Sequence, residues 1–500
     1  MEIMTSNYLL VGSILVISAI LMSKIGPKVG IPSLMIFLIA GMIFGTDGLG
    51  IQFDSIKDAQ FIGMVALSVI LFTGGMDTQI KEIKPVIKQG IMLSTVGVAL
   101  TTLITGSFVY LFRGPLELQE PCTFAFCLLL AATMSSTDSA SVFSILRDQK
   151  MGLKHRAQPL LELESGSNDP MAYMLTIMLI QICSSPDASV GRLILNFVIQ
   201  FTVGSLMGYL MAEGTKYLQK KINLKNATLY PIIMLCVVFL TFSLTELLRG
   251  NGYLAVYIAG IIVGNSKIPQ KRECQKFLDG MTWLLQITMF ITLGLLVNPH
   301  ELLDIALIAI AVSVFLILIG RPVAVFLSLL PFKEPNSINA RTLISWVGLR
   351  GATPIIFATY PIAANIPGAS HIFNIVFFVT LTSLIVQGTT IPWISKRLEM
   401  TENLPDTKSS FGVELPEDAD STLSDMEVTA ELLKNGNRIK DIRLSNSDAL
   451  VVMIKRDKKH LVPKGNSELQ VGDKLLLLAK NKDEEKKEEK KAKPEENLES

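Results

Sequence analysis

The sequence predicts an all-α polytopic membrane protein with thirteen transmembrane helices, followed by a small cytosolic α+β domain. The first observation is composition: 50% of the 500 residues are hydrophobic, only 18% are charged, and the mean hydropathy is +0.46. Soluble domains carry about 25% charged residues. The second observation is uneven charge, because residues 1–400 carry +5 and the last hundred residues carry −4. Together they exclude a soluble enzyme, a nucleic-acid binder and a disulfide-stapled secreted fold.

Thirteen apolar segments approach the length of about 20 residues that a helix needs to cross a bilayer. They cover residues 7–23, 31–46, 59–76, 89–112, 121–146, 159–183, 192–213, 228–248, 252–265, 281–297, 301–330, 341–362 and 371–395. The first has no basic region before it and no small-residue cleavage site, so we interpret it as a span and not as a signal peptide. The five cysteines are odd in number and form no CxxC pair, which favours core residues over a metal or redox site.

The loops between these segments orient the chain, because short cytoplasmic loops collect Lys and Arg. With the N-terminus outside, the cytoplasmic loops contain 21 basic residues and the outer loops contain 4. The outer four are Lys57, Arg113, Arg192 and Arg249. The loop charges therefore predict thirteen spans, a periplasmic (outer) N-terminus and a cytoplasmic C-terminus.

Two basic residues, Arg321 and Arg350, remain inside the predicted spans. Because Arg321 precedes Pro322, we expect a kinked helix whose arginine extends to the membrane interface. Arg350 lies in SWVGLRGATP, between Gly348 and Gly351. Such a segment predicts an interrupted helix, whose freed backbone must line protein or water.

Acidic side chains also lie within predicted spans, where ionisable groups are costly and usually functional. They are Asp77, Asp138, Glu162, Glu164 and Asp169. For Asp77, Glu162 and Glu164, an ion pair that only holds helices together is an equally good interpretation.

Asp138 and Asp169 stand among side chains that offer oxygen. The hydroxyls around Asp138 belong to Thr133, Ser135, Ser136, Thr137, Ser139 and Ser141. Asp169 follows Ser165 by one helical turn and has Asn168 beside it. Oxygen donors suit a hard cation, whereas a transition metal would favour His or Cys. We therefore predict a cation site at these two carboxylates.

The fifth and twelfth spans contain SSTDSAS and GLRGATP, and both are disrupted. They are seven spans apart, so they cross the membrane in opposite directions. This pattern indicates an inverted repeat of spans 1–6 and 8–13 joined by span 7. Broken helices at matching positions of such repeats are typical of a transporter's midplane site.

Three motifs together resemble the cation:proton antiporter-1 family, the NhaP-like sodium or potassium/proton exchangers. They are ESGSNDP at 164–170, Thr137-Asp138 after a serine-rich stretch, and WVGLRG at 346–351. The resemblance covers essentially all of residues 1–398. It implies an NhaA-like fold of thirteen helices with two crossed broken helices, a homodimer in the lipid membrane, and a transporter in place of an enzyme. It implies no cofactor beyond the transported K⁺ or Na⁺ and H⁺.

The resemblance also implies roles for single residues. Asp169 would hold either the cation or the proton, and Ser165 would add a ligand. Asn168 and Thr137-Asp138 would brace the crossing or line the site. The expected position of K⁺ or Na⁺ is therefore at Asp169, Ser165 and Thr137.

Two further expectations come from the same resemblance. Arg350 is expected to pair with a carboxylate of the sixth span, Glu164. The family often has LFEGG in the third span, and this chain has LFTGGMD, with Thr73 in place of the glutamate. Asp77, one turn later, is a possible substitute, and the exchange could shift cation preference.

The last hundred residues predict a separate cytosolic part. Residues 399–412 are polar and contain proline, which indicates a linker, and residues 413–481 alternate short apolar runs with turns, which indicates a small α+β domain. The run at 449–479 resembles the RCK C-terminal (TrkA-C-like) domain of potassium transporters and channels, a dimerising regulatory module that often binds small ligands. Residues 482–500 are a Lys/Glu run, which predicts a solvated disordered end.

The combined expectation is a secondary antiporter of the inner (plasma) membrane that exchanges K⁺ or Na⁺ for H⁺. Asn168 in place of a second carboxylate indicates one-for-one, electroneutral exchange, and the TrkA-C-like tail favours K⁺. The alternative is an RCK-regulated ion channel, because residues 95–98 (TVGV) resemble part of a potassium filter, although they sit in a span without a re-entrant loop. A membrane enzyme is disfavoured, since the sequence contains no HExxH or GxSxG motif.

Overall fold

The computed structural model describes two compact units of the chain, Met1–Asn403 and Leu404–Ser500. The described residues are 2–24, 32–114, 122–185, 189–222, 224–332, 337–403, 421–429, 432–433, 436–441, 449–456 and 459–480. Of the predicted linker at 399–412, residues 401–403 form a strand and residues 404–412 lie outside the described ranges, as does the charged end at 482–500.

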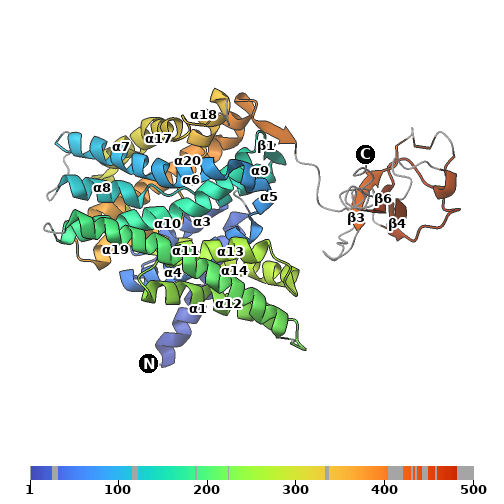
Figure 1. Ribbon diagram of the computed structural model, residues 1–500, viewed down its shortest axis with the longest axis horizontal. Helices are drawn as coiled ribbons and strands as arrows, with labels where there is room; N and C mark the ends of the chain where they lie inside the picture. The colour runs from blue at the N-terminus through green and yellow to red at the C-terminus, as the bar shows by residue number, and fades with distance from the viewer. Residues whose placement is uncertain are drawn as a thin grey trace, which may run out of the picture. The chain divides into compact units, whose positions relative to one another are not determined.

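The first unit is helical (Figure 1). Its helices are α1 (Glu2–Ser23), α3 (Ser33–Phe44), α4 (Ile56–Asp77), α5 (Ile80–Ile83), α6 (Ile87–Met92), α7 (Val98–Leu111), α8 (Phe124–Thr133), α9 (Ser139–Asp148), α10 (Ala157–Ser184), α11 (Val190–Lys221), α12 (Leu229–Leu247), α13 (Gly252–Gly264), α14 (Lys271–Leu295), α15 (Pro299–Asp304), α16 (Ala306–Phe315), α17 (Arg321–Ser328), α18 (Ile338–Trp346), α19 (Ala352–Ala363) and α20 (Ala369–Arg397). Two π-helical turns, Leu93–Gly97 and Leu316–Gly320, lie between α6 and α7 and between α16 and α17.

Seven helical stretches in the described part of the chain are long and apolar enough to cross a membrane. They are Ile56–Asp77, Ile80–Leu111, Val190–Lys221, Leu229–Leu247, Lys271–Leu295, Ala306–Ser328 and Ala369–Arg397. Shorter apolar helices accompany them, and α8 and α19 among these each continue a second short helix across an interruption. The unit is therefore that of a multi-pass helical membrane protein.

The helices pack as two bundles within this unit. The scaffold bundle consists of α1, α3, α4 and α11–α14, and the site bundle consists of α6–α10 and α16–α20. In Figure 1 the green helices α11–α14 gather with α4 in the lower part of the view, and α7, α8, α17 and α18 lie in the upper part. Helix α19 packs against α4, and α10 against α13, so these helices join the two bundles.

Close backbone contacts hold the scaffold bundle together. Gly41 of α3 lies against Gly294 of α14, and a Cβ added at Gly41 would stand 2.3 Å from a backbone carbonyl oxygen of that helix. Gly260 of α13 lies against Gly75 of α4, again with a carbonyl oxygen 2.3 Å from the added Cβ. The two contacts are equivalent under one shift along the chain: Gly41 lies as far before Gly260 as Gly75 lies before Gly294. Helix α3 therefore corresponds to α13, and α4 to α14, which makes the two contacts reciprocal. The surrounding sequences IAGMIFG (39–45) and IAGIIVG (258–264) also match.

Two helices of the site bundle are interrupted. Helix α8 ends at Thr133 and α9 begins at Ser139, and residues 135–138 between them have no regular secondary structure. Helix α18 ends at Trp346 and α19 begins at Ala352. These are the two disruptions expected from SSTDSAS and GLRGATP.

A short two-stranded sheet closes the first unit. Strand β1 (Met151–Leu153), which follows α9, pairs antiparallel with β2 (Thr401–Asn403), which follows α20. The backbone N–H of Lys154 donates to the carbonyl of Met400 at 2.9 Å and extends the pairing. The end of the membrane unit is therefore tied to the loop after the first interrupted helix.

The described residues of the second unit form a four-stranded antiparallel sheet in the order β3-β6-β4-β5. Its strands are β3 (Ser421–Glu427), β4 (Leu450–Arg456), β5 (Lys459–Leu461) and β6 (Lys474–Lys480). Its apolar core contains Val428, Val451, Ile454, Leu469, Leu475 and Leu477. Arg456 donates to both carboxylate oxygens of Asp473 at 2.8 Å, and these hydrogen bonds hold the pKa of Asp473 below its usual range.

Candidate ion-binding site

Asp169 lies where α10 meets both interrupted helices. Its Oδ1 accepts a hydrogen bond from the hydroxyl of Ser136, in the first interruption. Its Oδ2 accepts from the hydroxyl of Thr353 at 3.4 Å, in the first turn of α19. The residue is 7% exposed, so its carboxylate is shielded from solvent while it is hydrogen-bonded to the first interruption and to α19.

The neighbouring polar residues fasten α10 to the first interruption. Asn168 donates from Nδ2 to Thr137 Oγ1 at 2.5 Å. Ser165 donates from Oγ to the carbonyl of Thr137 at 2.8 Å, and the same Oγ accepts from the backbone N–H of Ser139 at 3.0 Å. The structure thus brings together Asp169, Asn168, Thr137 and Ser165. The Ser165 hydroxyl bonds the backbone of Thr137 and Ser139, and the Thr137 hydroxyl accepts from Asn168, so these bonds involve backbone and amide groups and not the Asp169 carboxylate.

Several oxygens at this point could hold a cation. The Oδ1 of Asn168 is buried and has no hydrogen-bond partner among the described residues. The Asp169 carboxylate and the hydroxyls of Ser136 and Thr353 complete a set of hard donors. No group of three or more His, Cys, Asp and Glu side chains with metal-binding geometry occurs in the described part. The donor set therefore suits an alkali cation or a proton better than a transition metal.

Each interruption supplies hydrogen-bond partners for backbone groups of the other. The N–H of Asp138 donates to the carbonyl of Leu349 at 2.8 Å. Arg350 reaches back with Nη1 to the carbonyls of Ser135 at 3.1 Å and Ser136 at 2.7 Å. Buried backbone groups without partners are costly, so the interruptions are stable because they lie together.

The two helices that start after the interruptions are capped differently. Asp138 caps α9, because its Oδ1 accepts from the N–H of Ser141 at 3.1 Å and its Oδ2 accepts from the Ser141 hydroxyl. Gly351 precedes α19 without a side chain. A Cβ at Gly351 would stand 2.4 Å from Asp138 Oδ2, so only glycine leaves room for the carboxylate of the other interruption.

The expected ion pair between Glu164 and Arg350 is wrong, because Glu164 pairs with Arg321. Both side chains are buried, with exposures of 1% and 2%. Arg321 therefore does not extend to the membrane interface as its position before Pro322 suggested. The π-helical turn Leu316–Gly320 shifts the helical register just before Arg321 and places the guanidinium in the bundle interior, where Gly348 lies against it.

Thr73, at the position where the resemblance implies a glutamate, has local partners. Its hydroxyl donates to the carbonyl of Val69 at 2.9 Å and accepts from Thr282 at 3.2 Å. Asp77 lies at the end of α4, within electrostatic range of Asp279, Glu162 and Arg147. These carboxylates form an acidic group near one end of the helices, and their role stays a prediction.

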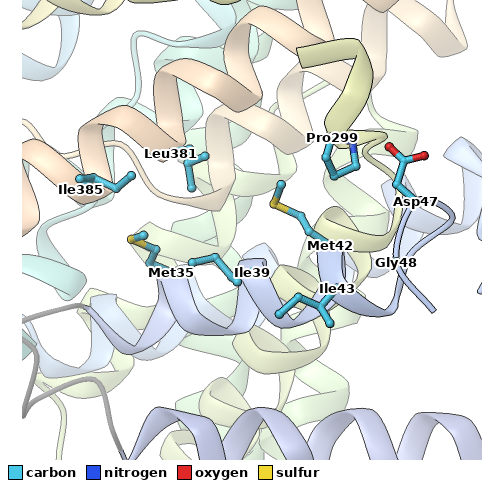
Figure 2. Close-up of a pocket in the computed structure, with 9 residues that line it drawn as sticks. All are labelled: Met35, Ile39, Met42, Ile43, Asp47, Gly48, Pro299, Leu381 and Ile385. Atoms are coloured by element: carbon cyan, nitrogen blue, oxygen red, sulfur yellow. The ribbon is translucent and has the colours of Figure 1, made fainter. Parts of the chain in front are cut away.

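A separate cavity of about 420 Å³ lies between α3, α15 and α20 (Figure 2). Its lining is Met35, Ile39, Met42, Ile43, Asp47, Gly48, Pro299, Leu381 and Ile385. Aliphatic and thioether side chains cannot replace the hydration shell of a cation, and Asp47 at the rim belongs to an exposed ion pair with His300. The cavity is therefore no competitor to Asp169 as an ion site.

The segment that resembled a potassium filter is helical. Residues 93–97 form a π-helical turn that continues directly into α7. A selectivity filter needs backbone carbonyls that are free to face the ion, whereas carbonyls of a continuous helix are bonded along it. The structure offers no filter at this position.

The fold and the site together define a helical membrane protein whose buried carboxylate sits where two interrupted helices meet. Residues 12–397 match the family described as "Sodium/hydrogen exchanger, transmembrane", and residues 435–490 match the TrkA-C domain. The chain belongs to this sodium/hydrogen exchanger family.

Relatives match over nearly the whole chain. The "K(+)/H(+) antiporter NhaP2" of Shewanella sp. (strain ANA-3) is 38% identical over 486 residues, which cover 95% of this chain and 82% of that protein. The "K(+)/H(+) antiporter NhaP" of Alkalimonas amylolytica is 37% identical over 97% of this chain and 83% of its own length. The solved structure of the sodium proton antiporter MjNhaP1 from Methanocaldococcus jannaschii at pH 8 has a TM-score of 0.67 and 24% identity, covering 80% of this chain and 99% of that one. This last likeness shows the shared fold.

Proposed function

We propose that the chain is a secondary antiporter that exchanges K⁺ for H⁺, one for one, at Asp169. The observation that carries the proposal is the charge of the site. The two interruptions, α10 and α17 bring together two arginines and three carboxylates, which are Arg321, Arg350, Asp138, Glu164 and Asp169. Their formal sum is one negative charge, which one monovalent cation or one proton neutralises. Relatives that carry the name K(+)/H(+) antiporter support K⁺ as the cation.

Only Asp169 among these carboxylates is available as the carrier. Glu164 is paired with Arg321, and Asp138 caps α9. An empty site would leave one uncompensated charge, which costs several kcal/mol in a buried environment. This cost opposes crossing without a ligand and couples the two ions. Asn168 supplies an amide oxygen without adding a charge, which supports electroneutral exchange.

We propose thirteen membrane spans with inverted repeats, the N-terminus outside and the C-terminus in the cytoplasm, in the inner membrane. The reciprocal glycine contacts Gly41–Gly294 and Gly75–Gly260 support the repeat, and the contacts between the two interruptions support their crossing. In this orientation Asp77, Glu162 and Asp279 lie at the cytoplasmic end. The remaining parts of the proposal are a homodimer, regulation by the TrkA-C domain, and no enzymatic activity or resident cofactor.

The test is exchange in proteoliposomes with Asp169→Asn. Asparagine keeps the shape of the side chain but cannot carry a proton or neutralise a cation, so we expect K⁺-driven collapse of a pH gradient to be lost while the protein stays folded. Asp58→Asn, in the exposed first turn of α4, is the matched control and keeps exchange. Wild-type exchange in Asp169→Asn would refute the site, and a steady K⁺ current without proton movement would identify a channel.

The tail is tested by truncation after Asn403, which keeps the β1–β2 pairing. We expect exchange to persist and its dependence on cytoplasmic ligand or ion concentration to change. Loss of the folded membrane unit would show that the tail is needed for structure.

A further inference from the structure

Three tyrosines from three helices meet beside the site. Tyr173 lies on α10, Tyr253 begins α13, and Tyr360 lies on α19. The hydroxyls of Tyr253 and Tyr360 are 3.2 Å apart. The ring of Tyr173 stands edge-on to both, with centroid distances of 5.0 Å to Tyr253 and 5.4 Å to Tyr360. We call these three residues the tyrosine cluster.

The tyrosine cluster lies next to the site, on the side where α13 begins. Tyr173 follows Asp169 by four positions and Tyr360 follows Thr353 by seven, so each lies on the same helix face as the site residue below it. Both helices run from the site towards the end of the bundle where α13 begins. In the orientation proposed above, this is the outer end of the membrane.

The two ends of the site differ in burial. Towards the outer end, Tyr253 is 0%, Phe357 0% and Tyr173 9% exposed. Towards the cytoplasmic end, the residues of α10 around Ser165 and the Glu162 side chain are partly exposed. Tyr360 is itself partly exposed, so buried aromatic side chains cover the outer side of Asp169 with the Tyr360 ring at their margin, and the cytoplasmic side is more open around Ser165 and Glu162.

The tyrosine cluster also joins the two bundles. Tyr253 belongs to the scaffold bundle, whereas Tyr173 and Tyr360 belong to the site bundle. The carboxylate of Glu246, at the end of α12, lies within electrostatic range of all three tyrosines. It accepts a hydrogen bond from the N–H of Gly252 at 2.9 Å and so marks the outer rim of the cluster.

We propose that the Tyr253–Tyr360 hydroxyl pair, backed by Tyr173, is the outer closure of the ion pathway. The pair must separate whenever Asp169 exchanges its ion with the outside. One neutral hydrogen bond is a suitable closure, since its net contribution shifts an equilibrium by about fivefold and so can be broken in every cycle. The inference rests on the proposed antiport, because a closure has a role only where access alternates.

Removal of either hydroxyl should favour the state open to the outside. The test is exchange by Tyr253→Phe and Tyr360→Phe in right-side-out and inside-out vesicles, with KM for K⁺ measured on each face. Apparent affinity is the intrinsic affinity scaled by the fraction of protein in the competent state. If the closed state dominates, KM at the outer face falls about fivefold, while KM at the cytoplasmic face changes far less. The double variant should match Tyr360→Phe, because that single change already removes the Tyr253–Tyr360 bond, together with the hydrogen bond between Tyr360 and Gln60.

The matched control is Tyr230→Phe. The hydroxyl of Tyr230 donates to the carbonyl of Ile222 at 2.8 Å, within the scaffold side of the molecule, so its loss leaves both KM values unchanged. Equal KM changes at the two faces, or none, in an exchanging Tyr253→Phe protein would overturn the closure. Absence of exchange in the wild-type protein would instead refute the proposed function itself.

Discussion

The scaffold bundle and the site bundle hold their helices together in opposite ways. In the scaffold bundle, glycines let backbones touch, as at Gly41 with Gly294 and Gly75 with Gly260. In the site bundle, the backbone is interrupted and charged side chains occupy the gaps, as Arg350 does at the carbonyls of Ser135 and Ser136. The packing of the scaffold bundle therefore depends on glycines, whose lack of a side chain lets backbones touch. The packing of the site bundle depends on a hydrogen-bond partner for each buried charge.

This contrast suits the proposed antiporter, in which Asp169 binds either a cation or a proton. A frame of close backbone contacts has no alternative packing of similar energy, because protein interiors are densely filled. Hydrogen bonds to interrupted backbone can be remade with other partners. We therefore expect substitutions in the scaffold bundle to change stability first, and substitutions in the site bundle to change exchange first.

The largest effect is expected from Arg350→Met. The change leaves the carbonyls of Ser135 and Ser136 without their charged donor, and hydrogen bonds to charged groups contribute about 1.5–3 kcal/mol each. We expect exchange in vesicles to fall at least about a hundredfold, which corresponds to about 3 kcal/mol. Arg113→Met, at an exposed arginine over the Tyr110 ring, should keep exchange. Undiminished exchange in Arg350→Met would show that the interruption does not need the guanidinium.

Gly41→Ala and Gly260→Ala should destabilise the fold by similar amounts. Each new Cβ would stand 2.3 Å from a backbone carbonyl oxygen, which cannot rotate away. Overpacking of this kind typically costs about 1–3 kcal/mol, visible as a lower Tm of the purified protein. Gly74→Ala is the control, because nothing lies within 4 Å of its added Cβ. If Gly41→Ala were as stable as Gly74→Ala, the close contact would not exist.

Gly351→Ala should lower exchange more than stability. Its Cβ would stand 2.4 Å from Asp138 Oδ2, a side-chain atom that can move aside. The displaced carboxylate would weaken the cap of α9, which costs about 1 kcal/mol of stability, so we expect a smaller fall in Tm than for Gly41→Ala and, because Asp138 adjoins the Asp169 site, a roughly fivefold slower exchange. A large fall in Tm with normal exchange per folded molecule would reverse the contrast between the two bundles.

The sequence predicted which polar residues of α10 and the first interruption meet better than it predicted their hydrogen-bond partners. Asp169, Asn168, Thr137 and Ser165 come together as the motifs indicated, because three of them share one helix face or adjoin it. The hydroxyls on the Asp169 carboxylate, from Ser136 and Thr353, were not singled out as its ligands. Their contact arises only when two distant interruptions meet.

Arg321 shows why the ion pair was assigned to the wrong arginine. An arginine before a proline near a span end has the pattern of a side chain that reaches the interface. The π-helical turn before it, which no hydrophobic period reveals, directs it inward to Glu164. Reciprocal contacts such as Gly41–Gly294 are equally hidden, since each glycine alone is ordinary in a membrane helix.

The smallest effect concerns the Asp47–His300 pair, outside the spans at the link from α14 to the site bundle. His300 Nδ1 lies 2.6 Å from Asp47 Oδ2, and the backbone N–H of His300 donates to the same oxygen at 3.0 Å. The hydrogen bond to Asp47 raises the pKa of His300 above 6.5, and the hydrogen bonds from His300 lower the pKa of Asp47 below 3.8. The histidine's contribution is therefore complete below pH 6.5 and disappears as the pH rises through its raised pKa. The aspartate's contribution is complete above pH 3.8 and disappears as the pH falls through its lowered pKa.

His300→Gln should consequently lower Tm slightly at pH 5–6 and hardly at pH 9, because at alkaline pH the wild-type histidine is neutral as well. Asp47→Asn should show the same trend, since it removes the other partner of the same pair. Both residues lie at the exposed surface, so screening by salt should reduce the difference further. A Tm difference that is independent of pH would mean that the contact stabilises the protein through the backbone hydrogen bond of His300 and not through charge. The link between the bundles would then be as insensitive to charge as the packing of the scaffold bundle.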